Sequence, residues 1–345
     1  MNGRRIRGVF VQKCESAQRC PHSHLHPTTT RAYCTGPTST VISEMRAFAW
    51  FFGLVLGCLL LMGLVAYPSW MLLHPYFDFP FHRIASRVGE LALLVGMFFV
   101  ARHLGVATKQ GFGYGLPWRQ FIPAMLKALA LGVATMAPIA VVIGLMGLRV
   151  WKDGVTPDLS TLAHTALQGL LTGLSVALLE ETLVRGAMFT AISRESGVKL
   201  AVFLTSLLYA AGHFIARKTI PPDQVQWYSG LDLLTGTLRM FGDPLHYADA
   251  FLCLFGVGVL LALVRAATGN IASNMGLHAG WVWVITFMRE GQQPNDAHPL
   301  RFLVSQFDGV VGWLVLAWTV LIGFVIYRYY LRRSPAGLGA SSTSS

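Results

Sequence analysis

Charged side chains are scarce in this sequence, and acidic side chains are the scarcer of the two kinds. Asp and Glu number 16 and Lys and Arg 27 among 345 residues, so charged residues make up 12% of the chain. A soluble domain carries about a quarter. With 54% hydrophobic residues and a mean hydropathy of +0.53, the composition instead predicts an all-α polytopic bundle of membrane-spanning helices.

The sequence also lacks the patterns of several function classes. No Lys/Arg-rich patch is interleaved with aromatics, so the net charge of +11 fits basic flanks of membrane helices better than nucleic acid, and we expect no nucleic-acid partner. There is no His-Glu-x-x-His and no Walker A loop. The segment 173–177 lacks the second glycine of a nucleophile elbow. Gly256 and Gly258 suit helix packing better than dinucleotide binding.

The first 45 residues are polar and without periodicity, and no apolar core follows their basic cluster closely enough for a signal peptide. We expect a disordered extension upstream of a biological start at Met45; a targeting presequence is the competing interpretation. The segment could in principle bind a metal, but its spacing matches no standard zinc module. The residues concerned are Cys14, Cys20, His22, His24, His26 and Cys34. The five cysteines of the chain give no disulfide framework.

Apolar runs predict about eight spans, because about twenty apolar residues cross a bilayer as a helix. They are 47–67, 84–101, 121–147, 166–190, 200–216, 250–266, 271–288 and 309–331. An even number of spans places both termini on the same side of the membrane. The flanking basic residues favour the cytoplasm for that side, with the loop 217–249 outside as a partly ordered cap. We expect an integral protein of a bacterial inner (cell) membrane.

Three polar islands interrupt these runs: 180–185, 209–213 and 278–281. Carboxylates and imidazoles are costly in hydrocarbon and usually face a polar interior. Glu181 and Arg185 are four residues apart, share a helix face and can pair, whereas Glu180 points away from Arg185. One carboxylate is then neutralised within its own helix and its neighbour is available for another use. A purely structural ion-pair cluster is the alternative.

The two histidines have the same helical spacing to polar neighbours. Tyr209 and His213 share a face, as do Asn274 and His278. Each histidine alone could be a packing residue, but several such positions on consecutive spans favour one shared site. A carboxylate beside imidazoles can activate water for hydrolysis. Alternatively, Glu180, His213 and His278 could ligate zinc and leave one position for water.

These islands resemble the motifs of the CPBP (or Abi) family of intramembrane proteases, which includes the type II CAAX prenyl endopeptidases. The family pattern is Glu-Glu-x-x-x-Arg, then aromatic-x-x-x-His, then His-x-x-x-Asn. The chain matches the first motif at 180–185, the second at Tyr209 and His213, and the third at His278, after a Thr-Gly-Asn-Ile segment at 268–271. The resemblance covers roughly 165–290. Order, spacing and placement on spans all agree.

The resemblance implies roles for these residues. Glu180 would be the general base, His213 and His278 would assist it or coordinate a metal, and Glu181 with Arg185 would form the supporting pair. Val282 stands where the family often has an Asn that is thought to help hold the oxyanion. Asn274, on the same face, is a candidate substitute. Trp281 and Trp283 flank His278 and are candidate lining residues.

The resemblance gives the expected organisation and function. The segments are the extension 1–45, N-terminal spans 46–160, a catalytic core 161–290, a C-terminal span 291–333 and a disordered tail 334–345. The expected activity is an intramembrane endopeptidase acting on a membrane-associated protein or peptide, such as a CAAX-type or sorting-tail substrate, with zinc as the only candidate cofactor. Two rivals remain: a non-proteolytic scaffold or immunity factor, and a proton-coupled transporter. The transporter lacks the internal repeats that such folds show.

Overall fold

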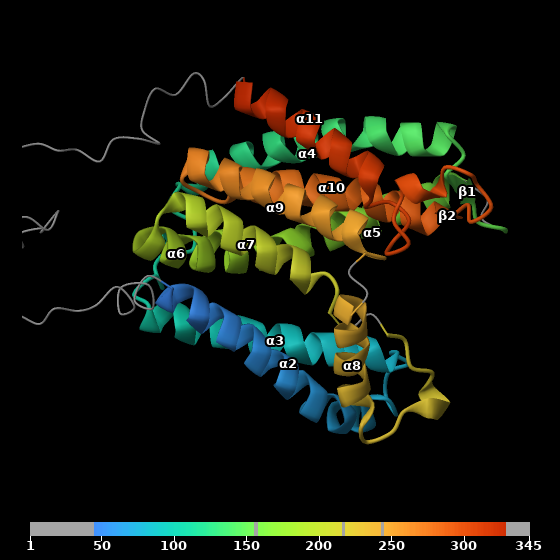
Figure 1. The fold of residues 1–345 in the computed structure, drawn as a ribbon, viewed down its shortest axis with the longest axis horizontal. Coiled ribbons are helices and arrows are strands. Elements are labelled where there is room, and N and C mark those ends of the chain that lie inside the picture. The colour runs from blue at the N-terminus through green and yellow to red at the C-terminus, as the bar shows by residue number, and fades with distance from the viewer. Residues whose placement is uncertain (1–44, 155–157, 216–217, 243–244, 329–345) are drawn as a thin grey trace, which may run out of the picture.

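The computed structural model describes residues 45–154, 158–215, 218–242 and 245–328 (Figure 1). The predictions for residues 1–44 and for the tail 334–345 lie outside these ranges. The described chain is an all-α bundle, as predicted, with one short two-stranded sheet. Its α-helices are α2 (Arg46–Leu73), α3 (Phe81–His103), α4 (Trp118–Leu145), α5 (Leu159–Glu180), α6 (Phe189–Ser196), α7 (Val198–Gly212), α8 (Ser229–Gly242), α9 (Ala248–Thr268), α10 (Ala272–Gly291) and α11 (Trp313–Ile326).

The remaining elements are short. They are the π-helix η1 (Glu181–Met188), the 3-10 turns η2 (Pro222–Gln224) and η3 (Arg301–Leu303), and the strands β1 (Arg149–Trp151) and β2 (Gln292–Pro294). The strands pair antiparallel, with Arg149 opposite Pro294. Buried Arg149 reinforces this strand pair by donating hydrogen bonds to the carbonyls of Gln292 and Gly309. Burial lowers the pKa of its guanidinium, and nearby Asp308 opposes that shift.

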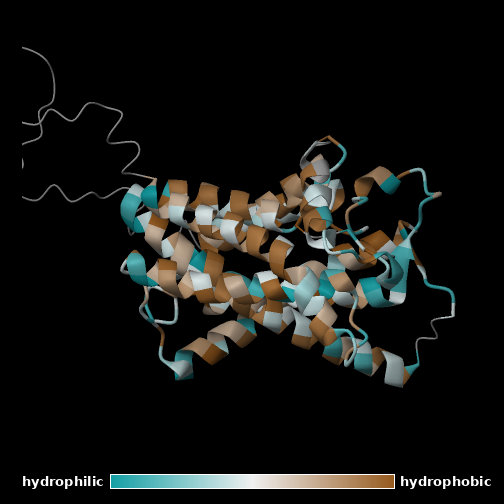
Figure 2. Cartoon of the chain, turned by 90° about the horizontal axis from the view of Figure 1, so that it is seen from below, coloured by the Kyte–Doolittle hydropathy of each residue, from teal (hydrophilic) through white to brown (hydrophobic). Residues whose placement is uncertain are grey.

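Five helical segments are long and apolar enough to cross a membrane, and two shorter apolar helices accompany them. The five are α2, α3, α4, the continuous run Leu159–Ser196 and α9, and the shorter two are α7 and α11. In Figure 2 the helices are brown through their middles, while teal side chains gather at helix ends and in loops. Length, composition and this distribution identify an integral membrane protein.

Each of the eight predicted spans overlaps a helical segment, but the count of eight is only approximate, because α7 and α11 are short and α10 is not among the five segments that qualify by length and hydropathy. Three further details differ from the sequence prediction. Helix α2 continues past Pro68 to Leu73, because a membrane helix can satisfy the carbonyl that a proline leaves free. The segment 217–249, predicted as a loop with some order, contains the helix α8. The strand pair β1–β2 was not predicted, since three-residue strands carry too little pattern to detect.

Helix α10 lies in the middle of the bundle, against α4, α5 and α9, while α7 and α11 pack on α9 (Figure 1). Glycines let α10 approach its neighbours closely. A Cβ on Gly132 of α4 would lie 2.6 Å from the Leu277 carbonyl oxygen, and one on Gly173 of α5 would lie 2.6 Å from that of Ala279. These backbone contacts bring the third polar island of the sequence against the first.

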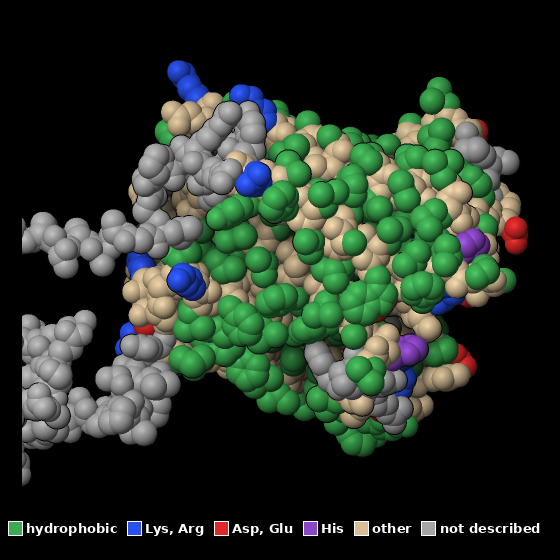
Figure 3. Space-filling model, turned by 45° about the horizontal axis from the view of Figure 1, so that its top comes forward, with side chains coloured by type: hydrophobic (Ala, Val, Ile, Leu, Met, Phe, Trp, Pro, Cys, Tyr) green, Lys and Arg blue, Asp and Glu red, His purple; other side chains and the backbone are tan. Residues whose placement is uncertain are grey.

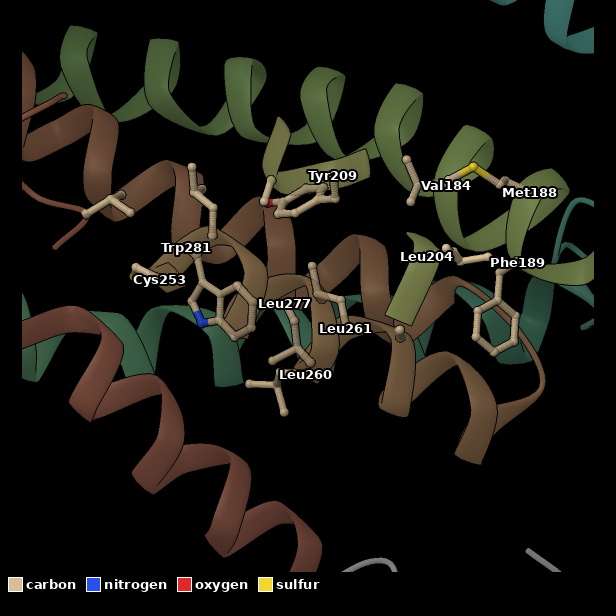
Figure 4. Close-up of a cluster of buried hydrophobic side chains, with 14 of the residues drawn as sticks. Val184, Met188, Phe189, Leu204, Tyr209, Cys253, Leu260, Leu261, Leu277 and Trp281 are labelled. Carbon is tan, nitrogen blue, oxygen red and sulfur yellow. The ribbon is translucent and has the colours of Figure 1, made fainter. Parts of the chain in front are cut away.

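Helices α2 and α3 form a layer that packs on η1 and contributes to the larger apolar cluster, and two further contacts tie its ends to the rest. At one end, both carboxylate oxygens of Glu195, in α6, accept hydrogen bonds from the first backbone amides of α2, Arg46 and Ala47. At the other end, a second apolar cluster joins α2 and α3 to Leu233 of α8 and to Ile220. The larger apolar cluster fills the space among α4, α7, α9 and α10 (Figure 4).

Candidate active site

The first polar island forms the junction of α5 with a π-helix. Glu180 is the last residue of α5 and Glu181 the first of η1. A π-helix bonds each amide to the carbonyl five residues back, and such segments inside α-helices are frequent at functional sites. The α-helical period used for the sequence prediction therefore does not hold here. The wider turn nevertheless keeps Glu181 and Arg185 on one face.

The predicted ion pair between Glu181 and Arg185 is confirmed, and it is fully enclosed. Both side chains have no exposed surface, and Arg185 Nη1 donates to Glu181 Oε1 at 3.3 Å. Arg185 Nη2 donates to the Gly258 carbonyl of α9 at 3.3 Å, and the guanidinium carbon lies 4.3 Å from the centre of the Tyr209 ring. A buried charge needs such partners, so this pair is an anchor between η1, α7 and α9.

His278 lies between the two neighbouring glutamates. Its Nδ1 is 2.8 Å from Oε1 of Glu181, and its Nε2 is 3.9 Å from Oε2 of Glu180. The ion-paired carboxylate of Glu181 can only accept a hydrogen bond, so Nδ1 carries the proton and Nε2 of the neutral ring is left as an acceptor directed at Glu180. The ring is buried, with 4% of its side chain exposed.

Glu180 differs from its neighbour in exposure and in partners: Glu181 is bonded through Oε1 and only its Oε2 has no partner, whereas no residue that the structure describes donates to either oxygen of Glu180. Its side chain keeps 34% of its surface exposed. Its Oε2 atom is shielded, yet it accepts no hydrogen bond from any residue that the structure describes. A buried polar atom without a protein partner calls for a water molecule or a ligand group. Oε2 of Glu180 and Nε2 of His278 are close enough for one water molecule to hydrogen-bond to both.

Tyr209 and His213 complete the constellation from α7. His213 follows the last turn of that helix, and its Nδ1 donates to the Tyr209 carbonyl at 2.8 Å. This bond again fixes the proton on Nδ1 and directs Nε2 the other way. The Tyr209 ring lies edge-on to both imidazoles, with centroids 4.6 Å from His213 and 5.9 Å from His278. The structure thus brings both histidines and both glutamates around one tyrosine.

Asn274 and Trp281 make contacts that the sequence did not predict. Asn274 is buried and its amide donates to the Leu261 carbonyl of α9 at 2.6 Å, so the contact braces α10 against α9. Its oxyanion role stays a hypothesis. Trp281 donates from Nε1 to Thr135 of α4, which turns its ring into the apolar core seen in Figure 4 rather than toward Glu180. Trp283 packs on Gly169 of α5.

Sequence reasoning gave no role to Arg265, which lies near the end of the predicted span 250–266. The helix α9 continues to Thr268, and Arg265 is buried one turn inside it. Its Nε donates to the Arg185 carbonyl of η1 at 2.9 Å, and its Nη2 to Oγ1 of Thr190 at 3.2 Å. A basic residue followed by three more helix-compatible residues was the only available signal. Arg265 therefore ties α9 to the π-helix η1.

The segment 104–117, between α3 and α4, covers η1 on another side and was also missed. The Tyr114 hydroxyl and Oγ1 of Thr182 are 2.6 Å apart, and a Cβ on Gly186 would lie 2.6 Å from the Phe112 carbonyl oxygen. Burial raises the pKa of the Tyr114 phenol, against the opposing effect of the Thr182 hydrogen bond. The phenol therefore keeps its proton, and the segment is tied to the residue that follows Glu181.

The zinc alternative is tested by the positions of the possible ligands. A zinc site needs three or four His, Cys or carboxylate donors around one point. Among the residues that the structure describes, no group of three or more such side chains is arranged to hold a metal ion. His278 is held on Glu181 and His213 on its own helix. The predicted ligand set does not fit as it stands, and no step is routed through a metal.

Comparison with known proteins gives one match. Residues 162–284 match the family described as type II CAAX prenyl endopeptidase Rce1-like. This match supports membership of the CPBP/CAAX-type family for that region. No curated protein and no solved structure matches the chain. The matched residues run from α5 into α10 and include all seven site residues named above. The family is one of CAAX-type intramembrane proteases, which agrees with the resemblance seen in the sequence.

Proposed function

We propose that the chain is an intramembrane endopeptidase that hydrolyses a peptide bond with water activated by Glu180. The observation that carries this proposal is the division between the two glutamates. Glu181 is enclosed and bonded to both Arg185 and His278, while Glu180 is half-exposed with a shielded oxygen facing Nε2 of the same histidine. A base held by an oriented partner is the arrangement that general-base catalysis needs.

The proposed reaction runs through these atoms. Glu180 takes a proton from a water molecule that also donates to Nε2 of His278, and the oxygen attacks the carbonyl carbon of the scissile bond. The tetrahedral intermediate loses the amine as the C–N bond breaks, and Glu180 returns the proton to that amine. The products are a carboxylic acid and an amine, and transfer of the acid's proton to the amine gives a carboxylate and an ammonium group. His213 assists: in its charged form both ring nitrogens donate, and Nε2 stabilises the developing oxyanion.

The proposed substrate is a membrane-associated protein or peptide of the CAAX or sorting-tail kind. The family match and the depth of the site in a helical bundle both support such a substrate. The scaffold or immunity-factor alternative rests on Val282, which offers no donor in place of the family's Asn. Against it stands the cost of keeping Glu180 and His278 away from bulk water when they have no reaction to perform.

The proposed orientation places both ends of the described chain in the cytoplasm. Helices α2 and α11 have their outer ends at the same end of the bundle, with the segment 104–117 (Figure 1). Most Lys and Arg side chains in view lie at that end, and the Asp and Glu side chains in view lie mostly at the other (Figure 3). Cytoplasmic loops carry the excess of Lys and Arg. A bacterial cell membrane stays our prediction for the location.

The test compares protein termini in membranes from cells carrying wild type, Glu180→Gln or Glu290→Gln at matched levels. Glu290 is an exposed carboxylate of α10 and serves as the matched acid-to-amide control. We expect termini that are present with wild type and Glu290→Gln and disappear with Glu180→Gln, and these identify the substrate. The same termini in all three samples, with Glu180→Gln folded, would favour the scaffold.

A further inference from the structure

Tyr209 carries a hydroxyl group that no contact within the fold accounts for. The residue is enclosed, with 6% of its surface exposed. Its hydroxyl nevertheless makes no hydrogen bond with any residue that the structure describes, whereas the hydroxyl of Tyr114 bonds to Thr182. The phenol oxygen is not one of the fully shielded unpaired atoms, as Oε2 of Glu180 is, so it keeps some accessible surface. An enclosed tyrosine usually has a partner for its O–H, so this hydroxyl is available to a ligand.

Three members of the candidate site hold the Tyr209 ring in place. The guanidinium carbon of Arg185 lies 4.3 Å from the ring centre. The imidazole centres of His213 and His278 lie 4.6 Å and 5.9 Å from it. A phenol oxygen lies in the plane of its ring, so contacts that fix the ring also fix where the oxygen lies. The hydroxyl is therefore held in one place without a hydrogen bond of its own.

The hydroxyl is directed toward the level of Glu180. In Figure 4 the oxygen end of the Tyr209 ring points away from Val184 and toward the part of the bundle that holds Cys253. Glu180 precedes Val184 by four residues in the chain, so it lies on that same side of Val184. Among the charged groups around the phenol, Glu180 acts on it most strongly. The free hydroxyl thus lies beside the carboxylate that is the proposed base.

We propose that the Tyr209 hydroxyl is a catalytic hydrogen-bond donor that stabilises the oxyanion of the tetrahedral intermediate. This inference rests on the proposed function, because an oxyanion forms there only if a peptide carbonyl is attacked beside Glu180. As the water oxygen bonds to the carbonyl carbon, an electron pair of the C=O bond moves to its oxygen. Tyr209 donates its O–H to that oxygen and keeps the proton. When the C–N bond breaks, the C=O bond forms again and the oxygen loses its charge.

The donors and acceptors of the site explain why a phenol suits this role. The carboxylates of Glu180 and Glu181 only accept hydrogen bonds, and Nε2 of neutral His278 also accepts. His213 donates from Nε2 only in its charged form, because its Nδ1 already carries the proton of the neutral ring. A phenol keeps its proton at neutral pH, so Tyr209 donates whatever the state of His213.

The first measurement tests whether the hydroxyl is free, and it needs no substrate. Tyr209→Phe removes the hydroxyl and leaves the ring on Arg185. Because no described residue bonds to that hydroxyl, we expect an unfolding temperature within about 1 °C of wild type. Tyr114→Phe is the matched control: it loses the contact with Thr182 and should unfold about 2 °C lower. A Tyr209→Phe protein that unfolds below Tyr114→Phe would place the hydroxyl in a bond within the fold and overturn the proposal.

The second measurement is kinetic. Its substrate is a synthetic cleavage-site peptide, which spans a bond whose cleavage in cells depends on Glu180. Tyr209→Phe should lower kcat about 10² fold with KM within about twofold, because the oxyanion exists only after the carbonyl is attacked. Tyr228→Phe, at an exposed position outside the site, is the control and should keep both constants. A phosphinate analogue of the peptide, an anionic mimic of the intermediate, should bind Tyr209→Phe weaker by the same factor as kcat falls.

The outcomes separate this proposal from the proposed function. A fall in kcat matched by weaker phosphinate binding supports the oxyanion role. A rise in KM with kcat retained would place the hydroxyl on the bound peptide instead, and overturn that role. A folded Tyr209→Phe protein with wild-type kcat, beside an inactive Glu180→Gln, would overturn the role of Tyr209 alone. If no protein termini depend on Glu180, the proposed function fails and the oxyanion role fails with it.

Discussion

Nδ1 of His278 lies 2.8 Å from Oε1 of Glu181, and this contact sets the chemistry of the whole site. It connects α10 to the π-helix, and it fixes which nitrogen of His278 carries the proton. Because Arg185 donates to the same carboxylate oxygen, Glu181 is held as an acceptor and cannot also serve as the base. Glu180 is therefore the carboxylate that can accept and release a proton.

We predict that His278→Gln lowers kcat by about 10² to 10⁴ fold, the usual contribution of a side chain that handles protons in a reaction. KM should change little, because the ring is buried and faces Glu180. Steady-state kinetics with the cleavage-site peptide measure both. A proportionate rise in KM with kcat intact would assign His278 to substrate binding.

We predict that Arg185→Ala destabilises the protein by about 3–5 kcal/mol, because it leaves Glu181 charged and unpaired in an enclosed site. Thermal unfolding in detergent measures the loss, and Arg119→Ala, an exposed arginine of α4, is the control. Changing Glu181 to Leu together with Arg185 to Met should recover part of the stability, since neither charge of the pair remains. Unfolding of Arg185→Ala at the wild-type temperature would contradict the anchor role.

Arg265 is predicted to act as a positioning residue. Its forked guanidinium reaches both the Arg185 carbonyl and Thr190, and a lysine cannot make both contacts. Arg265→Lys should cost about 1.5–3 kcal/mol of stability and lower kcat at unchanged KM, because η1 carries the base into place. Arg289→Lys, exposed on α10, is the matched control. A folded Arg265→Lys variant with wild-type kcat would show that the brace is only structural.

The close approach of α4 and α10 gives a test by a single methyl group. Gly132→Ala places a Cβ 2.6 Å from the Leu277 carbonyl oxygen, next to His278, whereas Gly144→Ala in the same helix meets nothing within 4 Å. The first should destabilise by about 1–3 kcal/mol, as overpacked sites do. The second should be neutral or slightly stabilising, because alanine favours a helix. Equal unfolding temperatures for Gly132→Ala and Gly144→Ala would mean that α4 and α10 are farther apart than the close approach at Gly132 indicates.

Removal of metal ions should leave the activity in place. The described His, Cys and carboxylate side chains do not gather three ligands around one point, and the proposed water is held by Glu180 and His278. Purified protein treated with 1,10-phenanthroline should cleave at the untreated rate, and its zinc content should fall well below one ion per chain. Loss of cleavage that added zinc restores would instead require Glu180, His213 and His278 to converge.

Much of the bundle could be predicted from the sequence because long apolar runs indicate membrane helices. The costly residues within those runs then located the site, and the four-residue spacing of Glu181 and Arg185 gave their contact in advance. The helix α8 was not predicted because its charged and polar residues resemble those of a loop. Pro68 misled the boundary of α2, since the rule that proline ends a helix is weaker in a membrane.

Other parts of the site depend on tertiary packing that no local pattern encodes. Nothing in the residues 181–188 distinguishes a π-helix from an α-helix, and its stability comes from Arg265 and the segment 104–117 packed against it. The direction of Trp281 depends on Thr135, which is far away in sequence. The bridging position of His278 between both glutamates needed the glycine contacts that bring α10 against α5.

The most direct measurement is the cleavage rate of the identified peptide by purified wild type and Glu180→Gln, each with its unfolding temperature. The account predicts a fall in kcat of at least about 10² fold. It also predicts an unfolding temperature equal to that of wild type, because Glu180 Oε2 has no hydrogen bond from the described residues to lose. A folded Glu180→Gln protein that cleaves at the wild-type rate would contradict the assignment of Glu180 as the base.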